Sequence, residues 1–276
     1  MKKPMKRFFT STGIVNKEAI IKRINEFLQT HGVSNSNRIR EIIKIVSDSD
    51  NSNVQDTLVH HELYEIGKII IFLGEQYPEL VVKAITTDGI SETNRNKDSK
   101  GRNTQFELLV ASIFLQAGFD IEFGEPDIYF HFRDQRYNIA CKRPKSKRKV
   151  LYNIKSACNQ IDQQNGIGIV LLDLTPTFSE KIAEYGSLQN MPGMSKKLIW
   201  DDFLCAHYKK IEKFSKEKVA AIHCFSSMNS RVQNSTVCHL FDYNIEIKKN
   251  RTEEDNLHYI INKIQSIDPS NFGPLV

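Results

Sequence analysis

The length, composition and charge of the chain indicate a globular protein and exclude several other classes. Its 276 residues are 40% hydrophobic and 26% charged, with a net charge of +5, and they suffice for one large or two modest domains. The longest apolar run, residues 66–74, is interrupted by Lys68 and is shorter than the roughly 18–20 residues that a membrane span needs. We therefore expect no membrane-spanning segment.

The N-terminus and the cysteines bear on where the protein works. No apolar segment follows the basic residues 1–13, so the sequence predicts no signal peptide. The five cysteines form no C-x-x-C pair: Cys141, Cys158, Cys205, Cys224 and Cys238. An odd number of unclustered cysteines favours reduced thiols over a disulfide framework or a zinc cluster. We expect a cytoplasmic protein.

Helical periodicity dominates the first third of the chain. Residues 16–32 carry apolar side chains at the 3.6-residue spacing of an amphipathic helix, which ends at Gly32. Segments 37–48 and 58–77 continue this pattern, and Pro78 begins a further short helix. We expect an all-helical N-terminal domain over residues 1–86, with a surface for a protein partner, followed by a polar linker over residues 87–103.

Histidines and glutamates gather within the third of these helices. His60, His61, Glu62 and Glu65 fall within two helical turns. Their spacing differs from H-E-x-x-H, which brings two imidazoles to one helical face. We expect a solvated polar face here rather than a metal site.

An α/β pattern occupies residues 104–276 and predicts one domain with a mixed sheet flanked by helices. The continuous apolar run at 166–175 is typical of a strand buried on both faces. Asp173, near its end, is expected to be a turn or helix-capping acid. The other expected elements are a helix over 104–117, a strand over 119–123, a hairpin over 125–144, helices near 153–162 and over 200–215, strands over 218–225 and 236–247, and a helix over 253–267.

The expected hairpin, EPDIYFHFRDQRYNIACKRP, has an acid at one end and a lysine at the other. A turn centred on residues 134 and 135 sets Asp127 directly opposite Lys142, on the face away from the core, and Ile128 opposite Cys141. A cross-strand ion pair, worth under ~1 kcal/mol, accounts for Asp127 and Lys142 structurally. A functional pair is the alternative.

The helix before the hairpin carries an acid on its apolar side. Glu107 shares a stripe with Val110, Ala111 and Phe114, so its carboxylate needs a partner. The segment TQFE is typical of a capping box, with Thr104 as the N-cap and Glu107 as its reciprocating acid. Capping and metal binding are both open for Glu107, and both can hold.

Positive charge is concentrated after the hairpin. Residues 135–161 hold eight Lys or Arg and no Asp or Glu, so the rest of the chain is net negative. A local positive field suits a polyanion, although a solvated loop over residues 142–149 is the structural alternative. The side chains expected to contact a nucleic-acid backbone are Arg143, Lys145, Lys147, Arg148, Lys149 and Lys155.

The order of these motifs resembles the PD-(D/E)xK nuclease superfamily. A helix glutamate is followed by P-D at 126–127, C-K-R-P at 141–144 and A-x-x-Q at 157–160, so the resemblance covers roughly residues 100–175. It implies a restriction-endonuclease-like fold in which Asp127, Glu107 and the backbone carbonyl of Cys141 bind Mg²⁺ or Mn²⁺. It also implies that Lys142 orients or activates the attacking water, and that Gln160 is the glutamine of the following helix.

One position departs from the family pattern. Ala140 stands where the acid of (D/E)xK is expected, and its methyl group cannot bind a cation. Mg²⁺ usually keeps several waters, so one or two carboxylates can suffice, which makes Glu107 the natural substitute. Glu125, on the other side of Pro126, is expected to be a solvated turn acid.

Three functions remain open. The first is a Mg²⁺-dependent nuclease acting on DNA, as a homodimer if both strands are cut; a role in defence against foreign DNA is implied by the resemblance alone. The second is a catalytically silent module of the same fold that binds nucleic acid or a protein partner. The third is a helical interaction protein whose α/β half is a scaffold.

Overall fold

The computed structural model describes residues 5–9, 13–14, 17–33, 36–48, 54–87, 100–178, 201–215, 217–232, 235–246 and 251–267. The chain divides into two compact units. A sheet unit comprises residues 1–10, 117–226 and 240–267, and a helical unit comprises residues 11–116, 227–239 and 268–276. Within the described ranges, no helix has the length and apolar character needed to cross a bilayer.

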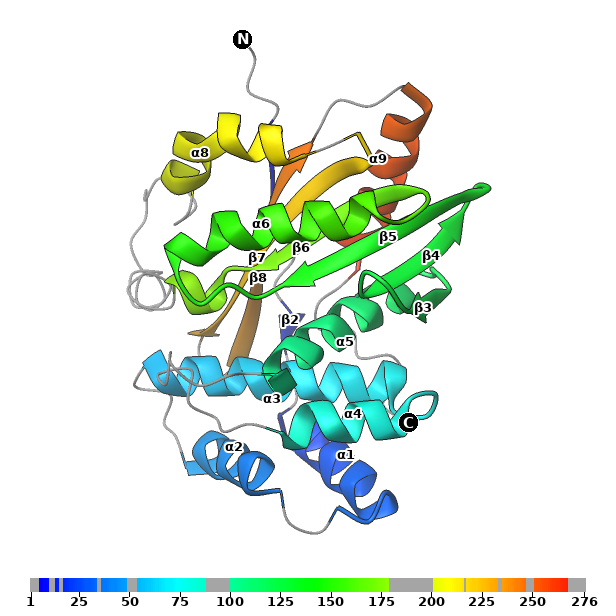
Figure 1. The fold of residues 1–276 in the computed structure, drawn as a ribbon. Helices are drawn as coiled ribbons and strands as arrows, with labels where there is room; N and C mark the ends of the chain where they lie inside the picture. Colours follow the sequence, from blue (N-terminus) through cyan, green and yellow to red (C-terminus); the bar gives the residue numbers. More distant parts are fainter. Residues whose placement is uncertain are drawn as a thin grey trace. The chain divides into compact units, whose positions relative to one another are not determined.

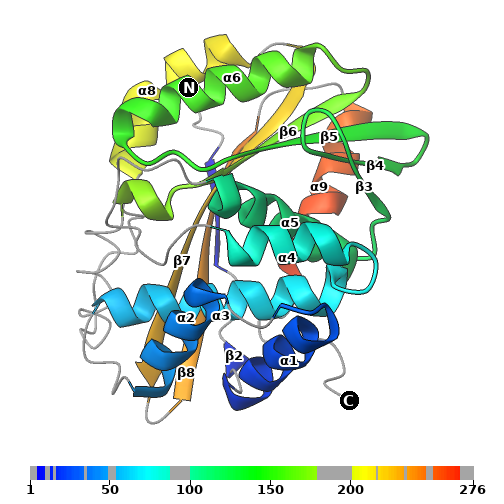
Figure 2. The same ribbon diagram turned by 60° about the horizontal axis from the view of Figure 1, so that its bottom comes forward.

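The helical unit is built around one central helix, α3 (Val54–Leu73), which packs against α1 (Lys17–Thr30), α2 (Asn37–Asp48), α4 (Pro78–Thr86) and α5 (Lys100–Gln116). Figures 1 and 2 both show α4 and α5 side by side. Gly67 permits the close approach of α3 to α1, because a Cβ there would lie 2.7 Å from Ile20 Cγ2. Aliphatic side chains from all five helices fill the core.

The polar residues expected on a solvated face of α3 are buried instead. His60, His61 and Glu62 are buried, and the Glu65 side chain is only 13% exposed, because α3 has helices packed around it. A helix surrounded by neighbours hides its polar face as well as its apolar one. The expectation of a solvated face was therefore wrong.

A network of charged and amide side chains compensates this burial. Arg38 donates to Glu62 Oε1 from Nε at 2.9 Å and from Nη2 at 2.6 Å, and Arg102 Nη1 lies 2.5 Å from the same oxygen. Arg38 Nη1 also donates to the backbone oxygens of Ala84 and Thr87, at 2.9 and 2.7 Å. The network thus ties α2, α3, α5 and the end of α4 together.

A second branch of the network passes through an amide. Gln105 accepts a hydrogen bond from Arg38 through Oε1 and donates from Nε2 to Glu65 Oε2 at 2.6 Å. Glu65 Oε1 in turn lies 2.9 Å from His61 Nε2. Each member of this branch thereby has a polar partner inside the unit.

Helix α5 begins earlier than the sequence indicated. It runs from Lys100, so residues 100–103 are helical rather than part of a linker, and Thr104 lies inside the helix. Thr104 therefore is not the N-cap, and the expected capping box does not form. Residues 88–99 of the expected linker lie outside the described residues.

The strands form the mixed sheet that the sequence predicted. The order is β1-β8-β7-β6-β5-β4-β3, with β2 paired to β8. Strands β3 to β5 are antiparallel, whereas β5, β6 and β7 are parallel. The bounds are β1 (Met5–Phe9), β2 (Gly13–Ile14), β3 (Ile121–Phe123), β4 (Ile128–Phe132), β5 (Gln135–Lys142), β6 (Ile167–Asp173), β7 (Val219–Val232) and β8 (Ser235–Glu246).

Helices flank this sheet. Helix α6 (Lys147–Asp162) connects β5 to β6 and packs along both strands, as Figures 1 and 2 show. Helix α8 (Asp201–Phe214) lies beside α6, and α9 (Arg251–Gln265) contacts the β4–β5 hairpin through a Tyr259 ring stacked on Phe132 at 5.0 Å. All seven residues of β6 are buried, as predicted.

The β4–β5 hairpin forms, but its register differs from the expected one. Ile128 pairs with Ile139 rather than Cys141, because the turn is formed by Arg133 and Asp134. Their φ angles of 49° and 60° are those of a two-residue hairpin turn of type I′. The difference of two residues preserves which side chains share a face.

Candidate active site

The start of β4 and the end of β5 bring Asp127 and Lys142 together, as the sequence predicted. Lys142 Nζ lies 3.2 Å from Asp127 Oδ2, and the backbone N–H of Cys141 donates to the same oxygen at 2.7 Å. The side chains of Asp127 and Lys142 are only 15% and 18% exposed. The pair is therefore largely, but not completely, withdrawn from water.

The local chain path explains how this pair forms despite the changed register. Extending the observed pairing by one residue sets Asp127 opposite Ala140, not Lys142. Lys142 lies two residues further along β5, within diagonal reach of its long side chain. Before β4, Pro126 is buried after a cis Glu125–Pro126 bond, and Gly124 N–H donates to the Asp127 backbone oxygen at 3.1 Å.

Burial raises the pKa of Asp127 above its ordinary value of 3.8. The ammonium of Lys142 and the Cys141 N–H both favour the carboxylate, but they do not offset the loss of hydration. Raised carboxyl pKa values occur disproportionately in functional sites, although structural pairs have them too.

The atoms around Asp127 fit a divalent cation that retains most of its waters. Both hydrogen bonds to the carboxylate reach Oδ2, so within the described part of the chain Oδ1 accepts none. The N–H and C=O of one strand residue point to the same edge of the strand. The Cys141 carbonyl therefore lies on the edge of β5 that faces Asp127, which offers a second oxygen of the kind that Mg²⁺ prefers.

The raised pKa gives a pH-dependent stability that can be measured. The folded state keeps the Asp127 proton to higher pH than the unfolded chain, so ionisation reduces stability as pH rises above 3.8 through the folded-state pKa. Asp127→Asn removes this loss. Denaturant unfolding should show the variant gaining stability relative to the wild type across that window, with no such gain below it.

Asp134→Asn, at an exposed turn position of the same hairpin, controls for the removal of one carboxylate. A difference between Asp127→Asn and wild type that stayed constant from acid to neutral pH would contradict the burial argument.

Arg143, expected to contact nucleic acid, is turned into the protein. Its Nε lies 2.7 Å from Asp173 Oδ2, and its side chain is 5% exposed. Asp173 Oδ1 accepts the N–H of Thr175 at 2.9 Å, which agrees with the expected role of Asp173 as a turn or capping acid. This ion pair joins the ends of β5 and β6 directly beside Lys142.

The other basic residues of the segment are placed differently. Lys147, Arg148, Lys149 and Lys155 are exposed on α6, and Lys145 is partly buried in the turn before it. Helix α6 begins at Lys147, earlier than expected, so the last three residues of the expected basic loop, 147–149, are helical.

Gln160 is not brought to Lys142. Helix α6 begins five residues after Lys142 and runs back along the strands, so Gln160 lies about 20 Å along the helix from Lys147. At that far end, Asn138 donates to the Asn165 backbone oxygen at 2.6 Å. The Gln160 Oε1 atom is buried, and no described residue donates a hydrogen bond to it.

Glu107 belongs to the helical unit, whereas Asp127 and Lys142 belong to the sheet unit. Its side chain is partly buried on α5, and Val110, Ala111 and Phe114 along its stripe are buried, as expected. Glu125 is exposed, also as expected. In the described ranges, no group of three or more His, Cys, Asp or Glu side chains is arranged to hold a metal ion.

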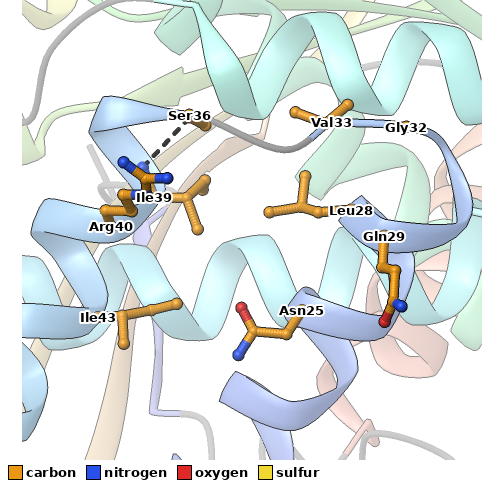
Figure 3. A pocket seen from close by; sticks show the side chains of 9 residues that line it. All are labelled: Asn25, Leu28, Gln29, Gly32, Val33, Ser36, Ile39, Arg40 and Ile43. Atoms are coloured by element: carbon orange, nitrogen blue, oxygen red, sulfur yellow. Dashed lines mark hydrogen bonds between the residues drawn. The ribbon is translucent and has the colours of Figure 1, made fainter.

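Sequence reasoning missed a pocket in the helical unit. It has a volume of about 340 Å³ and lies between α1 and α2 (Figure 3). Ser36 Oγ, at its rim, accepts the N–H of Ile39 at 3.3 Å. None of the residues expected to form the site lines it; the lining residues are Asn25, Leu28, Gln29, Gly32, Val33, Ser36, Ile39, Arg40 and Ile43.

No protein-family model, no curated protein and no solved structure matches the chain. A proposal about its function therefore depends on the residues of the site.

Proposed function

We propose that the protein is a metal-dependent nuclease that hydrolyses phosphodiester bonds in DNA, with Asp127 and Lys142 at its active centre. The observation that carries this proposal is the partly buried Asp127 carboxylate, with one oxygen on Lys142 and Cys141 and the other available. An acid and a lysine held together at strand ends are also what the resemblance to PD-(D/E)xK nucleases requires.

The protein groups have distinct roles in this proposal. Asp127 Oδ1 and the Cys141 carbonyl hold Mg²⁺ or Mn²⁺, while the Cys141 N–H fixes the orientation of the carboxylate. The bound ion would lower the pKa of a bound water and stabilise charge on the scissile phosphate. Lys142 stabilises the negative charge that develops on the phosphate as water attacks phosphorus and the sugar oxygen leaves.

Ala140 favours a second candidate, a nuclease-like module that binds nucleic acid without cutting it. Ala140 is completely buried and stands opposite Asp127, so a methyl group occupies the place where the family pattern has a carboxylate. With one carboxylate at the strand ends, the ion is held less firmly than in a site with two.

Incubating the protein with plasmid and linear DNA in Mg²⁺, Mn²⁺ or EDTA separates the two candidates. The nuclease cuts in either metal and stops in EDTA, whereas the module binds in a salt-dependent manner and leaves the DNA intact. Glu107→Gln belongs in the same assay, because the sequence predicts that Glu107 supplies a further carboxylate. Ala140→Glu provides a calibration: cutting that appears only in this variant would identify the natural protein as the silent module.

A further inference from the structure

Helix α6 presents two sharply different faces. Its apolar residues pack toward β5 and β6 and are fully buried: Val150, Ile154, Ala157, Cys158 and Ile161. Opposite them, Arg148, Tyr152, Lys155 and Asn159 are all exposed and follow one another at intervals of three or four residues. Such spacing places these four side chains in one stripe along the helix.

Tyr152 is an aromatic residue on a helix face that is otherwise polar and exposed to solvent. Its side chain is 66% exposed, and among the described residues the only other exposed large hydrophobic side chain is Tyr259. The Tyr259 ring stacks on Phe132, whereas the Tyr152 ring has the Lys149 ammonium 5.4 Å from its centre. The helix therefore offers an aromatic ring to solvent, surrounded by cations.

The surroundings of this ring are positively charged without compensation. Lys147, Arg148, Lys149 and Lys155 form no ion pair with any described residue, and the first acid of the helix is Asp162 at its last position. An arrangement of exposed cations around an aromatic ring complements a ligand with phosphates and flat rings. Single-stranded nucleic acid has both, and its bases are free to stack.

We propose that the exposed face of α6 binds single-stranded nucleic acid, with a base stacked on Tyr152 and the flanking phosphates on Arg148, Lys149 and Lys155. Bases inside a duplex are already stacked on one another, so a duplex engages the cations but not the ring. The proposal rests on the proposed function for the class of polyanion, nucleic acid, and it specifies the form of strand that the protein prefers.

Fluorescence anisotropy in EDTA tests this binding apart from any cleavage. Labelled DNA and RNA single strands of one sequence, and the corresponding DNA duplex, are titrated with wild type, Tyr152→Ala, Tyr152→Phe and Asn159→Ala. Tyr152→Ala should bind single strands roughly 5- to 150-fold more weakly than wild type, and it should bind the duplex as wild type does. The phenylalanine variant keeps a ring, and Asn159→Ala is the control on the same face; both should bind as wild type does.

Equal binding of single strands by wild type and Tyr152→Ala would overturn the proposal, as would an equal loss on single strand and duplex or the absence of binding to any strand. The DNA and RNA arms show which backbone is preferred. Ring-dependent binding by a protein that never cuts DNA would uphold this inference and refute the nuclease. Metal-dependent cutting of DNA, together with unchanged single-strand binding by Tyr152→Ala, would uphold the nuclease and refute this inference.

Discussion

Lys142→Ala and Asp127→Asn should each reduce metal-dependent DNA cleavage at least about 100-fold, which is the order of effect expected for removing one group that stabilises transition-state charge. The first substitution removes the ammonium 3.2 Å from Asp127 Oδ2, and the second removes the carboxylate that we propose holds the ion. Cleavage of a labelled duplex in Mg²⁺, followed over time, measures both losses.

Two matched variants control this experiment. Asp134→Asn changes an exposed acid at the opposite end of the same hairpin, and Lys210→Ala changes an exposed lysine on α8. Both should retain wild-type cleavage. If Lys142→Ala or Asp127→Asn remained folded and cut DNA as fast as these controls, the chemistry would lie elsewhere.

Glu62→Ala should destabilise the helical unit by about 3–5 kcal/mol, the range found when one partner of a buried ion pair is removed. Glu62 is 2% exposed and forms ion pairs with both Arg38 and Arg102, so its loss leaves two guanidinium groups in the interior without their shared carboxylate. Equilibrium unfolding in denaturant, followed by circular dichroism, measures this change.

Glu26→Ala is the appropriate comparison for Glu62→Ala. Glu26 forms ion pairs within α1, at 3.9 Å from both Lys22 and Arg23, but its side chain is 49% exposed. Exposed pairs contribute about 0–1 kcal/mol, so this variant should unfold close to wild type. Similar effects of the two substitutions would mean that the buried network does not hold the helices together.

The elements of the site could be predicted from the sequence, but their alignment could not. Alternation of apolar residues identifies β4 and β5 and assigns their faces. The register depends on the turn, and Arg133-Asp134 lacks the Asn-Gly or Gly-containing signal of a two-residue turn. Because a shift of two residues keeps the faces, the proximity of Asp127 and Lys142 was predicted despite the error.

The buried network could not be predicted, because its members are far apart in the sequence. Arg38, Glu62 and Gln105 come from three helices, and each one alone is an ordinary surface residue type. The apolar run at 66–74 was the available signal that α3 is a central helix. Burial of its polar half follows from packing on every side, which only the tertiary structure shows.

The position of Gln160 along α6 explains why it does not lie near Lys142, although Asp127 does. The A-x-x-Q motif fixes the sequence order, but α6 extends back to Lys147, so Gln160 is its fourteenth residue and lies at the far end of the strands. Likewise β1 and β2 were missed in the expected all-helical domain, because short strands form only when a distant partner, here β8, is present.

Locating Mn²⁺ by anomalous X-ray scattering in crystals of the wild type and of Asp127→Asn tests the central claim most directly. The proposal predicts a peak roughly 2 Å from Asp127 Oδ1 and from the Cys141 carbonyl, and no peak at this position in the variant. A wild-type crystal without a peak beside Asp127, or a peak that persisted unchanged in Asp127→Asn, would contradict it.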